Sequence, residues 1–457
     1  MRKVFGAGFL LFLLLYAGAQ LTRDRVVKPG ITTIRWCTDL NPARSVQTAL
    51  FQTLNPDVEV VLDPGARQKL IVQCATGTGP DVIDIFNADD MAAYVDSGIL
   101  LDLTDVAKAK GFGIENTYPA VHGGLVVAGR QYRYPCNVSA NAVIYNRAIF
   151  DDHGVPYPDA NWTYDQFIEA GRLILTTPSK SGAKHIPVAN FISNWFYLDL
   201  LVGYGGSLYR NQGLLSALDS PEAIDAMQFY RDLMYRHRVI TTPTEAAGMT
   251  SQGGWGSGGL NWFSSERAAM IFIGRWYLCQ VPNYPALKGK LGAARLPRVG
   301  DRPSSGRCNS RAAGINVNSP HREESIRFLQ YLASPEYGRV IVQDGDSMPP
   351  NPALAQSGLD LTNAVVSDPA FHQVFVDALR DSRSLDSSPF IDPSQVIRWL
   401  NERIGLVEND RVMPEEAMRA LAKEVNETIR LNLERRPDLQ RKYQEVTGKA
   451  YRSDWWQ

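Results

Sequence analysis

Short apolar runs alternate with segments of helical periodicity from residue 31 to about residue 98. Three β-rich runs are predicted to be strands: Ile31–Trp36, Val58–Leu62 and Val82–Phe86. Three segments have the apolar spacing of helices, and Gly98 is placed to end the last of them: Ala43–Leu54, Ala66–Ala75 and Asp89–Ser97. Strands that alternate with helices at this spacing indicate βαβ units and a largely parallel sheet. We therefore predict an α/β fold whose ligand would bind beyond the carboxyl ends of the strands, after Trp36 and Phe86.

The pattern changes further along the chain. Residues 151–238 are mainly helical in pattern, with a break at Gly203–Gly206, and further helices are predicted over 322–332 and 414–433. Residues 248–259 contain six glycines around Trp255, which indicates a loop that is either a linker or faces a ligand. Residues 297–311 are rich in Pro, Ser, Gly and Arg and are predicted to form a second connection.

The N-terminus has the layout of a secretory signal. Arg2 and Lys3 precede an apolar run from Val4 to Tyr16, and Ala17-Gly18-Ala19 then offers a cleavage pattern of small residues. The alternative is an uncleaved membrane anchor through residues 4–21, which is just long enough to span a bilayer. We favour cleavage and expect an exported protein in the periplasm or another extracytoplasmic space. No other stretch is apolar and long enough to cross a membrane, so the rest of the chain is expected to be one soluble body.

Charge and reactive residues narrow the classes of function. The chain has 47 basic and 48 acidic residues, and this balance argues against a nucleic-acid partner. The five cysteines form no C-x-x-C pair; Cys37 and Cys74 either pair with each other or stay buried as thiols. The six histidines lack metal-ligand spacing and no nucleotide-binding loop is present, so we predict no metal and no cofactor. A catalytic pair of carboxylates remains open, because acidic residues are plentiful.

Several blocks, in order, resemble the extracellular solute-binding proteins that serve carbohydrate ABC importers. The resemblance covers about residues 30–355, and its order and spacing are more specific than any single block. The matching blocks are Gly79–Ile83, Gly98–Leu103, Tyr134-Pro135, Val143–Arg147, Gly154–Pro156, Ser264–Trp276, Gly314-Ile315 and Ser334–Glu336. The resemblance implies the two-lobed periplasmic-binding-protein fold of type II, with the ligand in a cleft between lobes that crossing segments join. It places lobe one at residues 30–136 plus 303–329 and lobe two at residues 137–302 plus 330–457.

The same resemblance implies a set of ligand-binding residues. Trp276 and Trp195 match aromatic residues that stack on sugar rings, and Trp255 and Trp262 are further candidates in lobe two. Polar contacts are expected from Asn87, Asp89 and Asp90 after the third strand, and from Thr38 and Asp39 after the first. Ser139 lies where a maltose-binding member has a carboxylate, which argues against maltose, and Asn141 is a substitute polar contact. Core packing is the alternative for each tryptophan, as helix capping is for Asp89 and Asp90.

The resemblance implies a binding protein that is not an enzyme. It would capture a mono- or oligosaccharide by hinge closure and deliver it to the permease subunits of an ABC importer. The ATPase would be a separate polypeptide, since no Walker motif is present, and the binding protein is expected to be a monomer. The alternatives are an exported glycoside-processing enzyme and a membrane-tethered sugar-sensing module.

Overall fold

The computed structural model describes residues 30–64, 69–86, 88–190, 192–247 and 258–456. In the helix that begins at residue 88, the side chains of residues 88–90 and 92 are also outside the description. The predicted N-terminal signal or anchor, Asn87 and Trp255 therefore lie outside the described residues, as do the side chains of Asp89 and Asp90. Among the helices that are described, none has both the length and the hydropathy needed to span a lipid bilayer.

Residues 32–96 alternate between strands and helices as the pattern predicted, and a further helix follows that was not predicted. The elements are β1 (Thr32–Cys37), α2 (Ala43–Leu54), β2 (Val58–Leu62), α3 (Leu70–Ala75), β3 (Val82–Ile85), α4 (Ala88–Asp96) and the further helix α5 (Thr104–Lys110). β1 lies between β2 and β3 and pairs in parallel with both, because a helix returns the chain to the same end of the strands each time. Gly98 has a φ of +70°, as expected of a residue that ends a helix.

Two later segments complete this first lobe. They are the start of β6 (Arg133–Asn146) and the segment with β12 (Cys308–Ile315), α12 (Arg322–Leu332) and α13 (Pro335–Asp344). β12 runs antiparallel between β3 and β6. The core of the first lobe joins Trp36, Phe51, Phe328 and Tyr337, so that α2, α12 and α13 pack with the sheet. A hairpin of β4 (Val126–Val127) and β5 (Arg130–Gln131) precedes β6.

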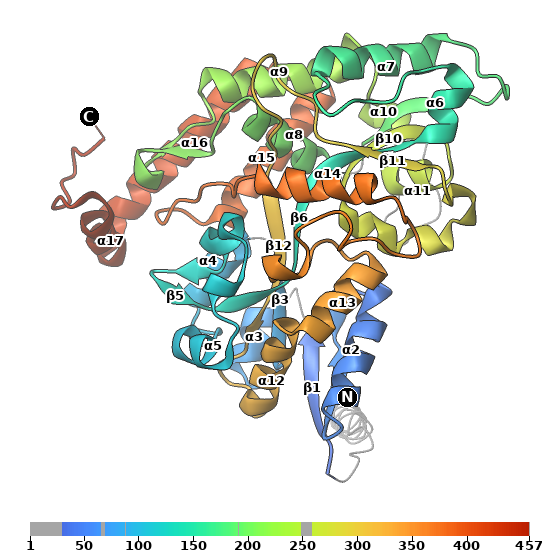
Figure 1. Cartoon of the computed structure of the whole chain (residues 1–457). Helices are drawn as coiled ribbons and strands as arrows, with labels where there is room; N and C mark the ends of the chain where they lie inside the picture. The colour runs from blue at the N-terminus through green and yellow to red at the C-terminus, as the bar shows by residue number, and fades with distance from the viewer. Residues whose placement is uncertain (1–29, 65–68, 87, 191, 248–257, 457) are drawn as a thin grey trace, which may run out of the picture.

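The second lobe continues from the same long strand and lies above the first in Figure 1. Its elements are α6 (Arg147–His153), α7 (Tyr164–Thr176), β7 (Ile186–Ala189), α8 (Ser193–Gly203), β8 (Tyr209–Arg210), β9 (Leu215–Ser216), α9 (Pro221–Tyr235), α10 (Pro243–Ala247), α11 (Gly259–Ser264), β10 (Ala268–Gly274) and β11 (Leu291–Ala294). β10 and β11 both pair with the later part of β6, and β7 pairs with β10 in parallel. β6 is therefore a strand of both lobes.

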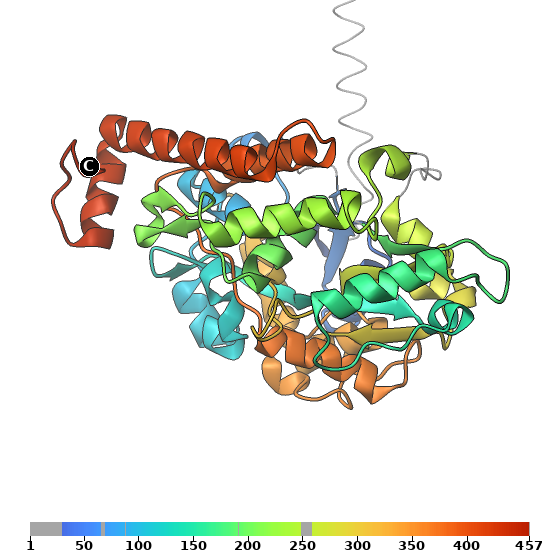
Figure 2. The same cartoon turned by 90° about the horizontal axis from the view of Figure 1, so that it is seen from above.

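Helices near the C-terminus cover the second lobe. They are α14 (Pro369–Arg380), α15 (Pro393–Glu408), α16 (Pro414–Arg435) and α17 (Pro437–Thr447). Figure 2 shows the long α16 beside α9, and the apolar residues of α15 and α16 belong to the same core as α8 and α9. Trp455 packs near Tyr443 of α17, and the guanidinium of Arg430 lies over the ring of Trp456.

The limit of lobe one at residue 329 has to be moved. Tyr337 and Ile341 of α13 belong to the first-lobe core, and α13 packs on α2, so the segment to Asp344 lies with the first lobe. The reason is that α12 and α13 form one helical pair against the sheet, a contact that the sequence blocks did not indicate. The chain crosses to the second lobe only after Asp344, where Met348 pairs with Val138.

The structure also corrects local expectations. The mainly helical segment 151–238 contains the strand β7, and the connection predicted over 297–311 already becomes strand β12 at Cys308. Cys37 and Cys74 form no disulfide with each other: all five cysteines are buried thiols. The predicted helices 43–54 and 322–332 and the strand 58–62 have the observed bounds, and the helix predicted over 414–433 ends two residues later.

Candidate functional site

A cavity of about 650 Å³ lies between the two lobes. Met91 and Arg133 line it from the first lobe, and Trp195 and Leu198 of α8 line it from the second. Arg307 and the first residues of β12, Cys308 to Ser310, also line it, so the cavity lies directly beside a segment that joins the lobes. A volume of this size is typical of sites that enclose a small organic ligand.

Asn141, which was expected to contact a ligand, binds a buried carboxylate, and Arg307 connects that carboxylate to Trp195, the other expected contact. Asp199 lies one helical turn after Trp195 on α8, and its Oδ2 accepts a hydrogen bond of 2.7 Å from Asn141 Nδ2. Its Oδ1 accepts a bond of 3.0 Å from the backbone N–H of Arg307, whose guanidinium carbon is 4.9 Å from the centre of the Trp195 ring. The stacked cation fixes one face of the indole, and Trp195 also lines the cavity.

Burial of Asp199 raises the pKa of its carboxyl group, while the charge of Arg307 and the bond from Asn141 oppose that shift. Neither Asp199 nor Arg307 was among the predicted site residues. Asp199 had a signal in the sequence, because it is the one charged residue of an otherwise apolar helix. Arg307 had none, since it lies in a segment that was predicted to be a connection.

Ser139 and Trp276 lie next to each other on the joining strands. Gly274 ends β10 opposite Asn141 of β6, and Trp276 follows in the 3-10 turn Arg275–Cys279. A Cβ atom at Gly274 would be 2.3 Å from Ser139 Oγ and 2.7 Å from Trp276 Cδ1, so only glycine allows this approach. Among the described residues, the buried Ser139 Oγ has no hydrogen-bond partner. Across the strand pair, Ser139 faces Asn309, which lines the cavity.

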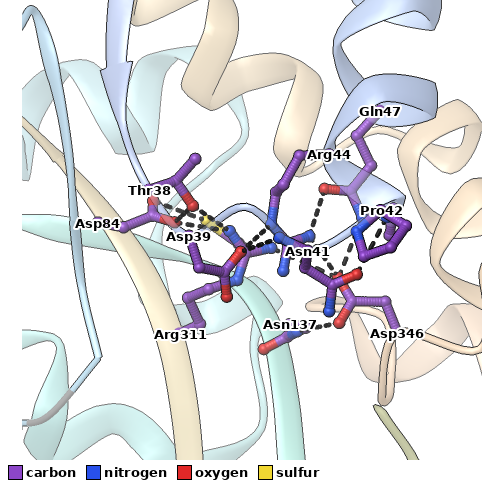
Figure 3. A network of polar contacts seen from close by, with 12 residues as sticks. Thr38, Asp39, Asn41, Pro42, Arg44, Gln47, Asp84, Asn137, Arg311 and Asp346 are labelled. Carbon is purple, nitrogen blue, oxygen red and sulfur yellow. Dashed lines mark hydrogen bonds and ion pairs between the residues drawn. The ribbon is translucent and has the colours of Figure 1, made fainter. Parts of the chain in front are cut away.

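Thr38 and Asp39 belong to a polar network at the edge of the first lobe, shown in Figure 3. Thr38 Oγ1 donates to Asp84 Oδ2 at 2.5 Å, and Arg311 Nη1 donates to the same oxygen at 2.6 Å. Asp39 Oδ1 accepts from Arg44 Nε at 2.9 Å. Both predicted contacts are thus held by neighbours within their own lobe, and Thr38 is 1% exposed. Ligand contact by these two residues stays a prediction.

Asp346 links this network to the segments that join the lobes. Its Oδ2 accepts from Arg44 Nη1 at 2.7 Å, and its Oδ1 accepts from Asn137 Nδ2 at 2.9 Å. Burial alone would raise the pKa of Asp346, but Arg44 and Arg311 beside it hold that pKa at about 2. The network is therefore charged at neutral pH, and its carboxylates compensate the two buried arginines.

Among the described side chains that were predicted as contacts, Trp195 alone lines the cavity. Asn141 lines a smaller neighbouring cavity together with Trp195, and Ser139, Trp276 and Trp262 line neither. Trp262 of α11 packs at the edge of a second-lobe core, with the guanidinium of Arg267 over its ring at 5.5 Å. This is the core packing that was weighed as its alternative. Asn87, Trp255 and the side chains of Asp89 and Asp90 fall outside the described residues, and their roles stay predictions.

Comparisons with known proteins place this cavity in context. The family model of the bacterial extracellular solute-binding proteins matches residues 39–339. A diacetylchitobiose-binding protein of Streptomyces coelicolor is 25% identical over 65% of this chain and 66% of its own length, just under two thirds.

Two solved structures share the fold. An ABC substrate-binding protein of Listeria monocytogenes in complex with cycloalternan has a TM-score of 0.72 and 20% identity, covering 87% of this chain and 98% of that one. A solute-binding protein of Thermotoga lettingae bound with α-D-tagatose has the same TM-score and 18% identity, covering 87% and 100%. These likenesses confirm the predicted fold class.

Proposed function

The chain belongs to the bacterial extracellular solute-binding proteins, and from this we propose that it captures a carbohydrate outside the cytoplasm for an ABC importer. The observation that carries the proposal is the cavity between the lobes, where the indole of Trp195 shares the lining with the side chains of Asn194, Asn309 and Ser310. A pyranose presents apolar C–H faces and polar edges, so a flat ring and fixed polar groups complement it. The relative from Streptomyces coelicolor is named for a disaccharide derivative, which supports the same ligand class.

In this proposal Trp195 meets the ligand in the cavity, and Ser139, Trp276 and Asn141 act from the segments beside it, outside its lining. Trp195 is held by Arg307, and Ser139 presents a hydroxyl that has no partner among the described residues. Trp276 is adjacent to Ser139, so stacking and hydrogen bonding would act on one sugar ring or on neighbouring rings. Asn141 supports the arrangement through Asp199. Asp89, Asp90 and Asn87 would add contacts from the first lobe.

We propose hinge closure as the mechanism of capture. β6, β12 and the crossing after Asp344 join the lobes, and the cavity has walls from both of them. A ligand that contacts both lobes binds the closed form better than the open form and so shifts the population toward it. The closed form would then dock on permease subunits whose ATPase is a separate protein. Export through the N-terminal segment, cleaved or retained as an anchor, and a monomeric state belong to the same proposal, as does the absence of catalysis.

Isothermal titration calorimetry of the purified chain against a panel of mono- and oligosaccharides tests the ligand class. We expect one sugar to bind each chain, and Trp195→Ala or Trp276→Ala to weaken binding about 10- to 100-fold, because each indole loses its contact with a sugar face. Trp456→Ala is the matched control, since this tryptophan is 49% exposed near the C-terminus. The Trp456→Ala variant should bind the sugar as tightly as the unchanged chain does. Binding of no sugar in the panel would defeat the carbohydrate assignment, and release of hydrolysed products would favour the enzyme alternative.

A further inference from the structure

A second group of polar side chains lies in the second lobe, where α6 ends and β7 is about to begin. Asp152 and His153 are the last two residues of α6, and His185 directly precedes β7. One ligand atom from each of the three residues lies within 4.8 Å of the other two. The spacing along the sequence did not indicate this group, because 32 residues separate the two histidines. The fold brings them together through the return of the chain after α7.

The orientation of His153 is fixed by a backbone carbonyl. Its Nδ1 lies 2.8 Å from the carbonyl oxygen of Thr177, which can only accept a hydrogen bond. Nδ1 therefore carries the hydrogen, and the neutral ring presents the lone pair of Nε2. That lone pair points toward His185 Nδ1, 3.0 Å away. A histidine held in this way by a carbonyl is the usual arrangement of a metal ligand, since the second contact sets both tautomer and ring direction.

Asp152 is held beside the histidines by the loop that follows α7. Its Oδ1 accepts from the backbone N–H of Ser181 at 2.8 Å, and its Oδ2 accepts from Ser181 Oγ at 2.7 Å. A carboxylate offers about four acceptor sites, so two hydrogen bonds leave capacity for one further ligand bond. Two imidazole nitrogens and one carboxylate oxygen make a donor set that suits zinc and related transition metals, whereas magnesium and calcium prefer oxygen alone.

We propose that Asp152, His153 and His185 bind one divalent transition-metal ion of the Zn²⁺ type. With bonds of about 2.0–2.1 Å, two nitrogens on a tetrahedral ion are about 3.3 Å apart, close to the separation seen here. A water molecule would take the fourth position. Without the ion, His185 Nδ1–H donates to His153 Nε2. With the ion, the hydrogen of His185 moves to Nε2 and both facing nitrogens bind the metal, so no net proton is released.

The ion would tie the loop of residues 177–185 to the end of α6. Thr177 and Ser181 of this loop already contact the two ligands of α6, and the loop supplies the third ligand itself at its last residue. The loop leads into β7, whose last residue, Ala189, lines a small cavity next to Asn141. The ion would therefore hold the entry into β7, at the end of this strand that is away from the cleft.

Zinc titration of a tag-free chain, stripped of metal with a chelator, tests the proposal. Calorimetry should find one Zn²⁺ per chain with a dissociation constant in the micromolar range or below, and no binding of Mg²⁺. His185→Ala and Asp152→Asn should each weaken zinc binding at least tenfold, and Zn²⁺ should raise the melting temperature of the unchanged chain but not that of His185→Ala. Both changes are at partly exposed positions, so the variants are expected to fold, which circular dichroism verifies.

His237→Ala is the matched control, because His237 is a partly exposed histidine of the same lobe that does not belong to the group. Its zinc affinity should equal that of the unchanged chain. The proposal is overturned if the metal-stripped chain takes up no Zn²⁺, or if His185→Ala binds it as tightly as the unchanged chain. In that case the two histidines share a hydrogen bond and nothing more. Sugar binding is measured in a separate titration, so either result leaves the proposed function to its own test.

Discussion

Arg275, the residue before Trp276, is a buried cation held by carbonyl oxygens and one imidazole. Its guanidinium donates to the carbonyls of Ser347 and Leu361, each at 2.6 Å, and its Nε donates to His372 Nδ1 at 3.1 Å. His372 Nε2 lies 2.7 Å from the carbonyl oxygen of Val366 and so carries the hydrogen. The imidazole is therefore neutral, and a second proton would have to displace the bond from Arg275. Burial and the charge of Arg275 lower the pKa of His372 to about 4.

This shift predicts how stability depends on pH. Since the pKa of His372 is lower in the folded chain than its ordinary 6.5, folding favours the neutral ring. The stabilisation is complete above pH 6.5 and is lost as the pH falls through 4, by about 3 kcal/mol in all. Urea denaturation at pH 7, 5.5 and 4 should show His372→Gln losing less stability than the unchanged chain over this range. His237→Gln is the control and should follow the unchanged chain; parallel curves for His372→Gln as well would contradict the assignment.

At the scale of elements, the end of β10 depends on a residue without a side chain. Gly274 lets β10 approach β6 so closely that Ser139 and Trp276 share the space beside it. Gly274→Ala would force Ser139 or Trp276 aside, and we expect sugar affinity to fall at least tenfold in calorimetry while the chain still folds. The matched control is Gly405→Ala in α15, where a Cβ meets nothing within 4 Å. That change should leave affinity intact and raise stability by up to about 1 kcal/mol, as alanine is the better helix former. Unchanged affinity in Gly274→Ala would remove this corner from the site.

Local patterns in the sequence predicted the elements that local forces determine. The helix α2 and the strand β2 have the expected bounds, because apolar periodicity and turn residues fix such segments within a few residues of themselves. The strand β7 was missed, since it has four residues and pairs in parallel with a strand about 80 residues later. The start of β12 was missed for the same reason: Cys308 and Asn309 become strand only by pairing with β6.

The candidate site was predictable to a similar extent. Trp195 and Asn141 were expected near the ligand, and the structure connects them, but the connection passes through Asp199 and Arg307, which lie 108 residues apart. No local pattern relates two such residues. Thr38 was expected directly after the first strand, and it follows β1, yet its hydroxyl is bound to Asp84 from another strand. Positions relative to strand ends follow from the fold, whereas the partner of each side chain follows from packing between distant segments.

On the scale of the whole molecule, all three segments that join the lobes contribute to one charged network. Asn137 comes from β6, Arg311 from β12, and Asp346 from the crossing after α13. Asp346 accepts from Asn137 and Arg44, and Arg311 Nη2 lies 3.5 Å from its carboxylate. Asp346 is 1% exposed, and it shares the compensation of the two buried arginines with Asp39, which pairs with Arg44, and Asp84, which pairs with Arg311. Removal of one partner from such a group leaves a buried charge uncompensated.

Asp346→Asn is therefore expected to destabilise the chain by about 3–5 kcal/mol at pH 7, as measured by urea denaturation. The pKa of Asp346 is about 2 in the folded chain and 3.8 ordinarily, so its stabilisation is present above pH 3.8 and is lost as the pH falls through 2. The difference between the two proteins should thus be constant from pH 5 to 8 and shrink in acid. Asp57→Asn is the control, because Asp57 pairs with Arg327 on the surface with its side chain 55% exposed, and it should change stability little. If Asp346→Asn were as mild as Asp57→Asn, the crossings would be held by backbone pairing alone. The expected loss would instead show that charge stabilises the joint between the lobes.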